Sequence, residues 1–188
     1  MNEYYSQHVR DYKKLLRLEG NILKEIEGYP YSKAEKTAFH LVNHLKPTHF
    51  VTLQLKQSRK IDATNGWKML INGDDKIFDK AYSAYIRSVS KAISARSKWS
   101  VYQERIGNAG WIQGGDGFER NHLHIVITKP SHVAEDAFRI ALHRLAYGNA
   151  WVEDGAHAID IQSIESAKEK INSTFYSGRK GSDRILMV

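Results

Sequence analysis

One short run of the sequence limits the possible folds more than any other, the alternating stretch from Asn121 to Thr128. His122 and His124 stand two residues apart in it, among β-branched and other apolar residues. Because strand side chains alternate with period two, both imidazoles would project from the same face of one strand. They could act as two ligands of one metal ion. Histidines in a half-buried strand can also be hydrogen-bonded only to protein neighbours, so other residues must decide between these interpretations.

The composition restricts the chemistry further. A chain of 188 residues can bury a core of its own, and one domain is the simplest expectation. It contains no cysteine, so any metal must be held by nitrogen and oxygen. No signal-type segment opens the chain and no apolar run approaches the roughly 20 residues of a membrane span, so we expect a cytoplasmic protein without a membrane partner. The formal charge of +7 favours a polyanionic partner such as nucleic acid, although many basic proteins bind nothing anionic.

The N-terminal residues 1–47 are predicted to form a helical extension packed on the domain. Apolar residues recur at helical spacing over residues 2–27, although Gly20 weakens this pattern. Ser32-x-x-Glu35 is a capping box that would open a further helix, which Pro47 would close. This extension would either pack on the remaining part, residues 48–188, or face DNA.

From residue 48 onward, strand patterns and helix patterns follow one another. Strands are predicted at residues 49–55, 100–106, 121–128 and 157–164. Helices are predicted to open at Asp74 or Asp75, at Ser131 and at Ser166, where Ser166-x-x-Glu169 is a second capping box. The polar residues 56–73 and the glycine-rich residues 107–117 are predicted to be loops, the second one mobile or wrapped closely round a ligand.

This order predicts the fold class. Strand, helix, strand, strand, helix, strand is the βαββαβ topology of ferredoxin-like and RRM-like folds, an α+β arrangement with a central antiparallel sheet and flanking helices. Right-handed crossovers would place the first and third strands in the centre and both crossover helices on one face. The other face would then be open to the terminal segments.

A third metal ligand is predicted on the second strand. Glu104 would lie beside the strand that carries His122 and His124, and two imidazoles with one carboxylate suit a divalent ion that keeps coordination positions open. Such an ion would polarise a phosphoryl oxygen. Alternatively, Glu104 is a surface carboxylate paired with Arg105 or Arg120.

Tyr176 is the candidate nucleophile. On the last helix it shares a face with Asn172 and Lys180 at i, i+4 spacing. A phenol beside a lysine and a bound metal could attack a phosphodiester, because both cations favour the phenolate and the charge of the transition state. A tyrosine next to Phe175 can also be a core or interface residue.

Together these patterns resemble the HUH endonuclease superfamily, in particular the rolling-circle replication initiators of plasmids, phages and small circular DNA viruses. The resemblance covers about residues 48–182. The family's strand with a Thr-Leu core is matched by Phe50-Val51-Thr52-Leu53-Gln54, and its histidine pair by His122-Leu123-His124-Ile125-Val126. In many members a glutamate on the preceding strand is a third metal ligand, and Glu104 stands in that place.

The family's last motif, a tyrosine followed three residues later by lysine, is matched less well. After Tyr176, Arg179 occupies the lysine offset and Lys180 comes one residue further on. A second alignment of the helix puts Asn172 at the tyrosine position and Phe175 at the lysine position. We prefer Tyr176, because Arg179 and Lys180 keep the positive charge.

The resemblance implies metal-dependent nicking and joining of single-stranded DNA, either free or as the loop of a hairpin origin. His122, His124 and Glu104 would bind Mn²⁺ or Mg²⁺, and Tyr176 would attack the scissile phosphate to give a 5′-phosphotyrosyl intermediate. Arg179 or Lys180 would support the charge. The expected DNA contacts are Thr52, Gln54, Arg59, Lys60 and Arg120. Replication would require a separate helicase.

Several alternatives remain open. A catalytically inactive DNA-binding relative would follow from the second alignment, and a single-tyrosine transposase or relaxase relative shares the superfamily. A histidine-triad nucleotide hydrolase would need a third histidine where Val126 stands. A two-histidine phosphoesterase would need two His-x-Thr/Ser elements, and His122-Leu123-His124 is not one.

Overall fold

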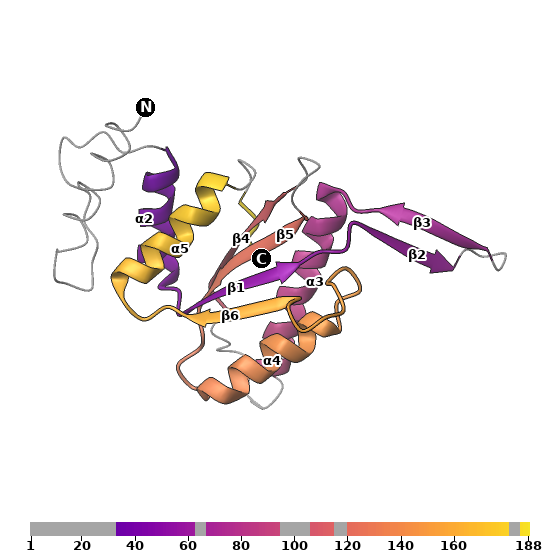
Figure 1. Ribbon diagram of the computed structural model, residues 1–188. Coiled ribbons are helices and arrows are strands. Elements are labelled where there is room, and N and C mark those ends of the chain that lie inside the picture. The colour runs from indigo at the N-terminus through magenta and orange to yellow at the C-terminus, as the bar shows by residue number, and fades with distance from the viewer. Residues whose placement is uncertain (1–32, 63–66, 95–105, 115–119, 181–184) are drawn as a thin grey trace.

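The computed structural model describes residues 33–62, 67–94, 106–114, 120–180 and 185–188. In these ranges a four-stranded antiparallel sheet is flanked by helices on both faces (Figure 1), which confirms the predicted α+β class with a ferredoxin-like arrangement. The predicted helix or helices of residues 2–27 lie outside the described ranges.

The sheet has the predicted strand order. Its order is β4-β5-β1-β6, so the first and third predicted strands lie in the centre. The strands are β1 (His49–Gln54), β4 (Asn108–Gln113), β5 (His122–Ile127) and β6 (Ile159–Ser163). Both neighbours of β1 run antiparallel to it.

One face of the sheet is covered by the two crossover helices, α3 (Asp75–Ser94) and α4 (Glu135–Tyr147). Alternate residues of β1 and β5 turn towards these helices, as the period of two predicts. They build a buried core with the helices, which includes Val51, Leu53, Leu123, Ile125, Phe78, Tyr85 and Phe138. This apolar layer fixes the register of β5, because a slip by one residue would turn its histidines into the core.

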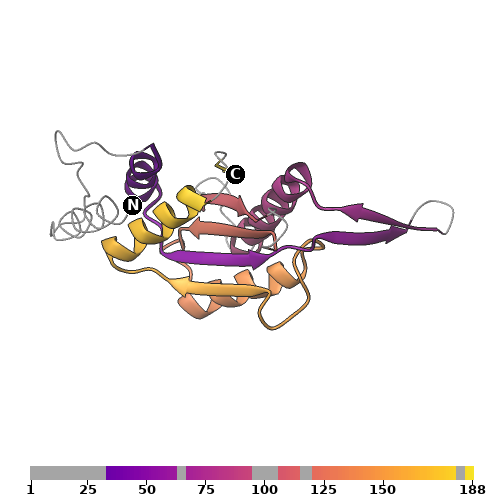
Figure 2. The ribbon, with the colours of Figure 1, turned by 45° about the horizontal axis from the view of Figure 1, so that its top comes forward.

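The other face is covered at one end by α2 (Lys33–Leu45) and α5 (Ala167–Lys180), which lie side by side (Figures 1 and 2). A second, smaller core lies beneath them, formed by Leu41, Phe50, Ala109, Trp111, Val126 and Ile164. Helix α2 therefore packs on the sheet. Helices α2 and α5 leave the opposite end of this face, where β1 ends and β5 begins, only partly covered.

The helix starts follow local hydrogen bonds. The backbone N–H of Ile77 donates to Asp74 Oδ1 at 2.8 Å, so Asp74 caps α3. At α5 the predicted capping box forms, since the N–H of Ser166 donates to Glu169 and the N–H of Glu169 donates to Ser166 Oγ. These bonds hold the pKa of Glu169 below its usual value.

Helix α4 begins later than predicted. Its N-cap is Ala134, which offers no capping side chain, so the assignment of Ser131 as the cap is wrong. No helix in the described ranges combines the length and the apolar character that a membrane crossing requires.

The glycine-rich segment is the largest correction to the sheet. Residues 108–113 form the edge strand β4, and the predicted loop is wrong there. Gly110 is needed because Tyr82 packs directly on it, and an added Cβ would lie 2.6 Å from Tyr82 Cε2. On the outer side of β4, Leu186 exchanges both backbone hydrogen bonds with Gly110. The predicted strand 100–106 lies outside the described ranges except for Ile106.

Residues 56–73 were predicted to be a loop, and this is also wrong. Strands β2 (Ser58–Asp62) and β3 (Lys68–Asn72) pair with each other and with no other strand of the described chain. Figures 1 and 2 show this ribbon projecting from the end of β1, away from the sheet. Its polar and basic residues gave no strand signal, because neither face contributes to a core.

Candidate functional site

The histidine face of the sheet is hollowed at the end that α2 leaves uncovered. An open hollow of about 380 Å³ lies there, between the ends of three strands and α5. Six of the residues predicted for the site line it, together with one that was not predicted: Thr52, Gln54, Arg120, His122, His124, Tyr176 and Gln113. The sheet register brings them together, since His122 pairs with Gln54 and Gln113, and His124 with Thr52.

The two histidines lie close enough to share an ion. Their ring centroids are 4.7 Å apart and the rings are nearly perpendicular. Each is held through its Nδ1 atom: His122 Nδ1 lies 2.9 Å from the carbonyl oxygen of Arg120, and His124 Nδ1 lies 3.0 Å from Thr52 Oγ1. A hydrogen bond at one ring nitrogen that orients the other is typical of metal-binding histidines.

His124 is more deeply buried than His122. Only 5% of it is exposed, its ring stacks on Phe50, and Tyr176 packs against it edge-on with ring centroids 5.6 Å apart. Both Thr52, which is hydrogen-bonded to His124, and Phe50, which stacks on its ring, belong to the neighbouring strand β1. These contacts fix the ring in one orientation.

Gln113 is the residue that the sequence analysis missed. It is buried on β4, its Oε1 lies 3.2 Å from His122 Nε2, and its Nε2 donates to the carbonyl oxygen of Ser177 on α5 at 3.1 Å. One side chain thus joins the histidine pair to the helix that carries Tyr176. An amide by itself does not indicate a metal site. The available signal was the alternation along the strand, which puts residues 109, 111 and 113 on the same face.

The contact between Gln113 and His122 tests whether an ion fits. A carbonyl oxygen can only accept, so His122 Nδ1 carries the proton towards Arg120. In the neutral ring, Nε2 is then an acceptor that faces a second acceptor, Gln113 Oε1. Two acceptors at this distance need a proton or a cation between them. A proton on His122 Nε2 or a bound cation would each satisfy the pair.

Tyr176 stands on α5 at the rim of the hollow and is 42% exposed. Of the two alignments of the last helix, the structure therefore brings Tyr176 to the histidine pair. Asn172 is exposed and is not among the described residues that line the hollow. Arg179 and Lys180 belong to the last turn of α5, and their side chains lie outside what the structure describes.

The other predicted residues are not among the described residues that line the hollow. Glu104 lies outside the described ranges, and within those ranges no cluster of three His, Cys, Asp or Glu residues is placed to hold a metal. The triad of His122, His124 and Glu104 stays a prediction, and among the described residues the amide of Gln113 on β4 lies beside His122. Arg59 and Lys60 lie on the exposed β2 strand.

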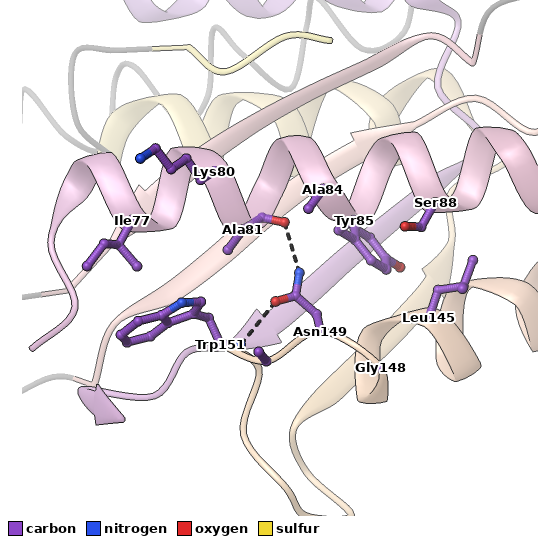
Figure 3. A pocket seen from close by; sticks show the side chains of 11 residues that line it. Ile77, Lys80, Ala81, Ala84, Tyr85, Ser88, Leu145, Gly148, Asn149 and Trp151 are labelled. Carbon is purple, nitrogen blue, oxygen red and sulfur yellow. Dashed lines mark hydrogen bonds between the residues drawn. The ribbon is translucent and has the colours of Figure 1, made fainter. Parts of the chain in front are cut away.

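A second hollow, of about 390 Å³, lies between α3 and α4 on the opposite side of the molecule (Figure 3). Among its described lining residues only Lys80 is charged at neutral pH. Asn149 crosses it, donating to the carbonyl oxygen of Ala81 and accepting from the N–H of Trp151. Burial raises the pKa of Tyr85 above its usual range, so this phenol stays neutral. The second hollow offers packing and no reactive cluster.

Comparisons with known proteins do not assign a family. No family model and no curated protein matches the chain. Among solved structures, the crystal structure of a hydrolase from Listeria innocua is similar with a TM-score of 0.29 and 11% identity. That similarity covers 63% of this chain and 56% of the hydrolase chain, and it is too low to carry an argument about fold or activity.

Proposed function

We propose that this protein is a metal-dependent enzyme that nicks and rejoins single-stranded DNA, as a replication initiator does. The observation that supports this most is the convergence of His122, His124, Gln113 and Tyr176 on one open hollow of a basic protein. A hollow that is open on one side suits an extended strand better than a small enclosed metabolite.

In this proposal His122, His124 and Gln113 hold a divalent ion, Mn²⁺ or Mg²⁺. When bound, the ion would withdraw electron density from a phosphoryl oxygen. Arg120 is exposed at the rim and would hold a neighbouring phosphate. Thr52 and Phe50 keep His124 in its orientation, so the site would be formed before DNA arrives.

Tyr176 would then act as the nucleophile. Its phenol loses a proton to solvent, its oxygen forms a bond to phosphorus, and the bond from phosphorus to the 3′ oxygen breaks. The 3′ oxygen takes up a proton, which leaves a free 3′-hydroxyl and a 5′-phosphotyrosyl link. Attack by that hydroxyl on the link reverses the step and rejoins the strand. Arg179 and Lys180, one turn along α5, would add positive charge.

The direct test is a covalent adduct. The protein is incubated with Mn²⁺ and a pool of single-stranded oligonucleotides labelled at the 3′ end, because the 3′ fragment is the one that stays attached. A denaturing gel should show labelled protein, and EDTA or Tyr176→Phe should remove it. Tyr147→Phe is the matched control, since Tyr147 is 47% exposed on α4, away from the hollow, and should leave the adduct unchanged.

The alternative is a DNA-binding relative without nicking activity. The replacement of lysine by Arg179 three residues after Tyr176 favours it. An active enzyme gives the adduct, whereas this relative binds the same oligonucleotides and gives none. Adduct formation that survives Tyr176→Phe would refute the assignment of the nucleophile. A role in replication would also need helicase activity to separate the DNA strands.

A further inference from the structure

Helix α2 carries a pair of histidines that the proposed nicking site does not use. His40 and His44 stand four residues apart, so both imidazoles project from the same side of the helix. Their rings are parallel, with an interplanar angle of 2°, and the ring centroids are 6.0 Å apart. Both residues are exposed, whereas Leu41 and Val42 between them are buried. The helix therefore presents two imidazoles side by side to solvent.

Two imidazoles at this spacing form a chelate for one metal ion. The same spacing places the two zinc-binding histidines of the H-E-x-x-H motif on one face of a helix. Leu41 stands where that motif has its glutamate, so the pair on α2 offers binding without the general base. Zinc–nitrogen bonds are about 2.0–2.1 Å long, so both rings must turn towards a common ion. Because both side chains are exposed, this rotation displaces no core residue.

The donor set selects the kind of metal. Imidazole nitrogens suit Zn²⁺, Cu²⁺ and Ni²⁺, whereas Mg²⁺ and Mn²⁺ prefer carboxylates, carbonyls and water. Within residues 33–45 the one acidic side chain is Glu35, which is buried and is not at i, i+3 or i, i+4 spacing from either histidine. The pair should therefore bind Cu²⁺ more tightly than Ni²⁺, and Ni²⁺ more tightly than Mn²⁺.

The histidine pair spans the last turn of α2, and a strained residue follows that turn. Lys46 has a φ of 48°, in the left-handed region that glycine favours. Its N–H donates to the carbonyl oxygen of Val42 at 3.0 Å, and the carbonyl oxygen of Leu45 accepts from Thr128 Oγ1. A metal bridge between the two histidines would hold this turn in helical form.

His44 also lines a third hollow, of about 540 Å³, where α2 ends and β4 begins. Lys46, Asn108 and Thr128 are among its other lining residues. The Asn108 amide is held in place, since its Nδ2 donates to the carbonyl oxygens of Ile106 and Val188. An ion bound to His44 would lie at the rim of this open space, so water or a small ligand could fill its remaining coordination positions.

We propose that His40 and His44 form a second metal site, on α2, for a late first-row transition metal: Zn²⁺, Ni²⁺ or Cu²⁺. The site goes beyond the proposed function, because α2 contributes no described residue to the hollow proposed for nicking and the pair favours another class of metal. Its effect is to clamp the last turn of α2. Since α2 lies beside α5, the clamp also supports the helix that carries Tyr176 (Figure 1).

The test is a calorimetric titration of the untagged protein with Ni²⁺. Every protein carries His124→Gln, which breaks the histidine pair of the nicking hollow. The parent should bind one Ni²⁺ on α2. His40→Ala and His44→Ala should each weaken binding about tenfold or more, because the second imidazole acts at a high effective concentration. Mn²⁺ should bind about tenfold or more weaker than Ni²⁺.

Two variants serve as matched controls. Lys36→His/His44→Ala moves the pair one turn towards the start of α2, because Lys36 is exposed and precedes His40 by four residues, and it should restore tight binding. His132→Ala/His143→Ala also removes two histidines, neither of which has another histidine at i, i+4 spacing, and it should leave Ni²⁺ binding unchanged. Circular dichroism checks that each variant keeps its helices.

Thermal melts provide a second readout. Ni²⁺ should raise the melting temperature of the parent more than that of either single variant, because the bridged turn forms only in the folded protein. Equal Ni²⁺ affinity in the parent and in His44→Ala would overturn the proposal, as would a folded Lys36→His/His44→Ala protein that does not regain binding. Tighter binding of Mn²⁺ than of Ni²⁺ would overturn the assigned class of metal. The adduct test concerns the nicking hollow alone, so its failure is distinguishable from each of these results.

Discussion

Each face of the sheet buries a histidine, and the surroundings of these two histidines differ. His49, 1% exposed, turns towards α4, where Glu135 Oε1 lies 2.7 Å from its Nε2 and Thr48 Oγ1 lies 2.9 Å from its Nδ1. Both of its nitrogens are bonded to protein. His124, 5% exposed, faces an open hollow shared with a second histidine, an amide and a phenol.

The comparison teaches how a buried histidine should be interpreted. Burial alone does not distinguish the two residues. Their surroundings differ. His49 lies against one carboxylate and the edge of Phe138 within a filled layer, whereas several polar side chains converge on the open hollow beside His124. Convergence of several polar side chains around open space distinguishes a candidate site from a filled layer.

The largest expected effect separates the two histidines by activity. His124→Gln should lower the rate of adduct formation about a thousandfold and remove the rise in melting temperature caused by Mn²⁺, because a metal ligand is lost. His49→Gln should keep both. Rates from gel densitometry and thermal melts with and without Mn²⁺ provide the measurement. Equal losses of activity in the two variants would contradict the comparison.

The next effect concerns stability. Leu123 lies between the two histidines and points into the opposite core, so Leu123→Ala should lower the free energy of unfolding by about 3 kcal/mol, through a buried cavity. Gln54→Ala, on the hollow side, should change it by about 0.5 kcal/mol or less. Urea denaturation in EDTA measures both. A larger loss for Gln54→Ala would mean that the hollow side also holds the fold together.

Gln113→Glu should divide binding from chemistry. The carboxylate attracts Mn²⁺ more strongly than an amide, yet it has no N–H for the carbonyl oxygen of Ser177. We expect tighter Mn²⁺ binding and adduct formation about tenfold slower at saturating Mn²⁺. Gln54→Glu adds the same charge to the hollow and leaves the hydrogen bond between Gln113 and Ser177 in place, so it serves as the control. A Gln113→Glu protein that reacts as fast as the parent would show that the link to α5 is unimportant.

The smallest effect is a pH dependence. Burial lowers the pKa of His49 below 6.5, and the hydrogen bond and charge of Glu135 oppose this in part, with Arg139 and Lys129 adding to the lowering. The unfolded chain therefore binds a proton at His49 before the folded protein does, so the free energy of unfolding falls as pH drops below about 6.5. Urea midpoints in EDTA should fall less steeply between pH 7.5 and 5.5 in His49→Gln. A slope identical to that of the parent would assign the pH dependence to other groups.

The sheet, its strand order and the histidine pair could be predicted from the sequence. The alternation in β1 and β5 was clear because one face of each strand is fully apolar, and the histidine pair was visible within it. The capping box at Ser166 predicted where α5 begins. Since β5 carries His122 and His124 and α5 carries Tyr176, the topology brings these residues to the same face of the sheet.

The missing parts had weaker local signals. The glycines around β4 suggested a loop, because the one inside the strand, Gly110, makes room for the Tyr82 ring, a contact from a distant helix. Gln113 was missed with that strand. The ribbon buries no face, so its polar and basic side chains concealed a strand pair, although Asn65-Gly66 between its two halves is a common hairpin-turn sequence.

The two hydrogen-bonding ends of Gln113 have a consequence for regulation. If the amide oxygen helps to bind an ion while the amide nitrogen holds the carbonyl of Ser177, ion binding and the docking of α5 are linked equilibria. If ion binding favours the docked position of α5 by some factor, docking of α5 must raise the affinity for the ion by the same factor. DNA that presses on α5 would then tighten or loosen the metal without touching it.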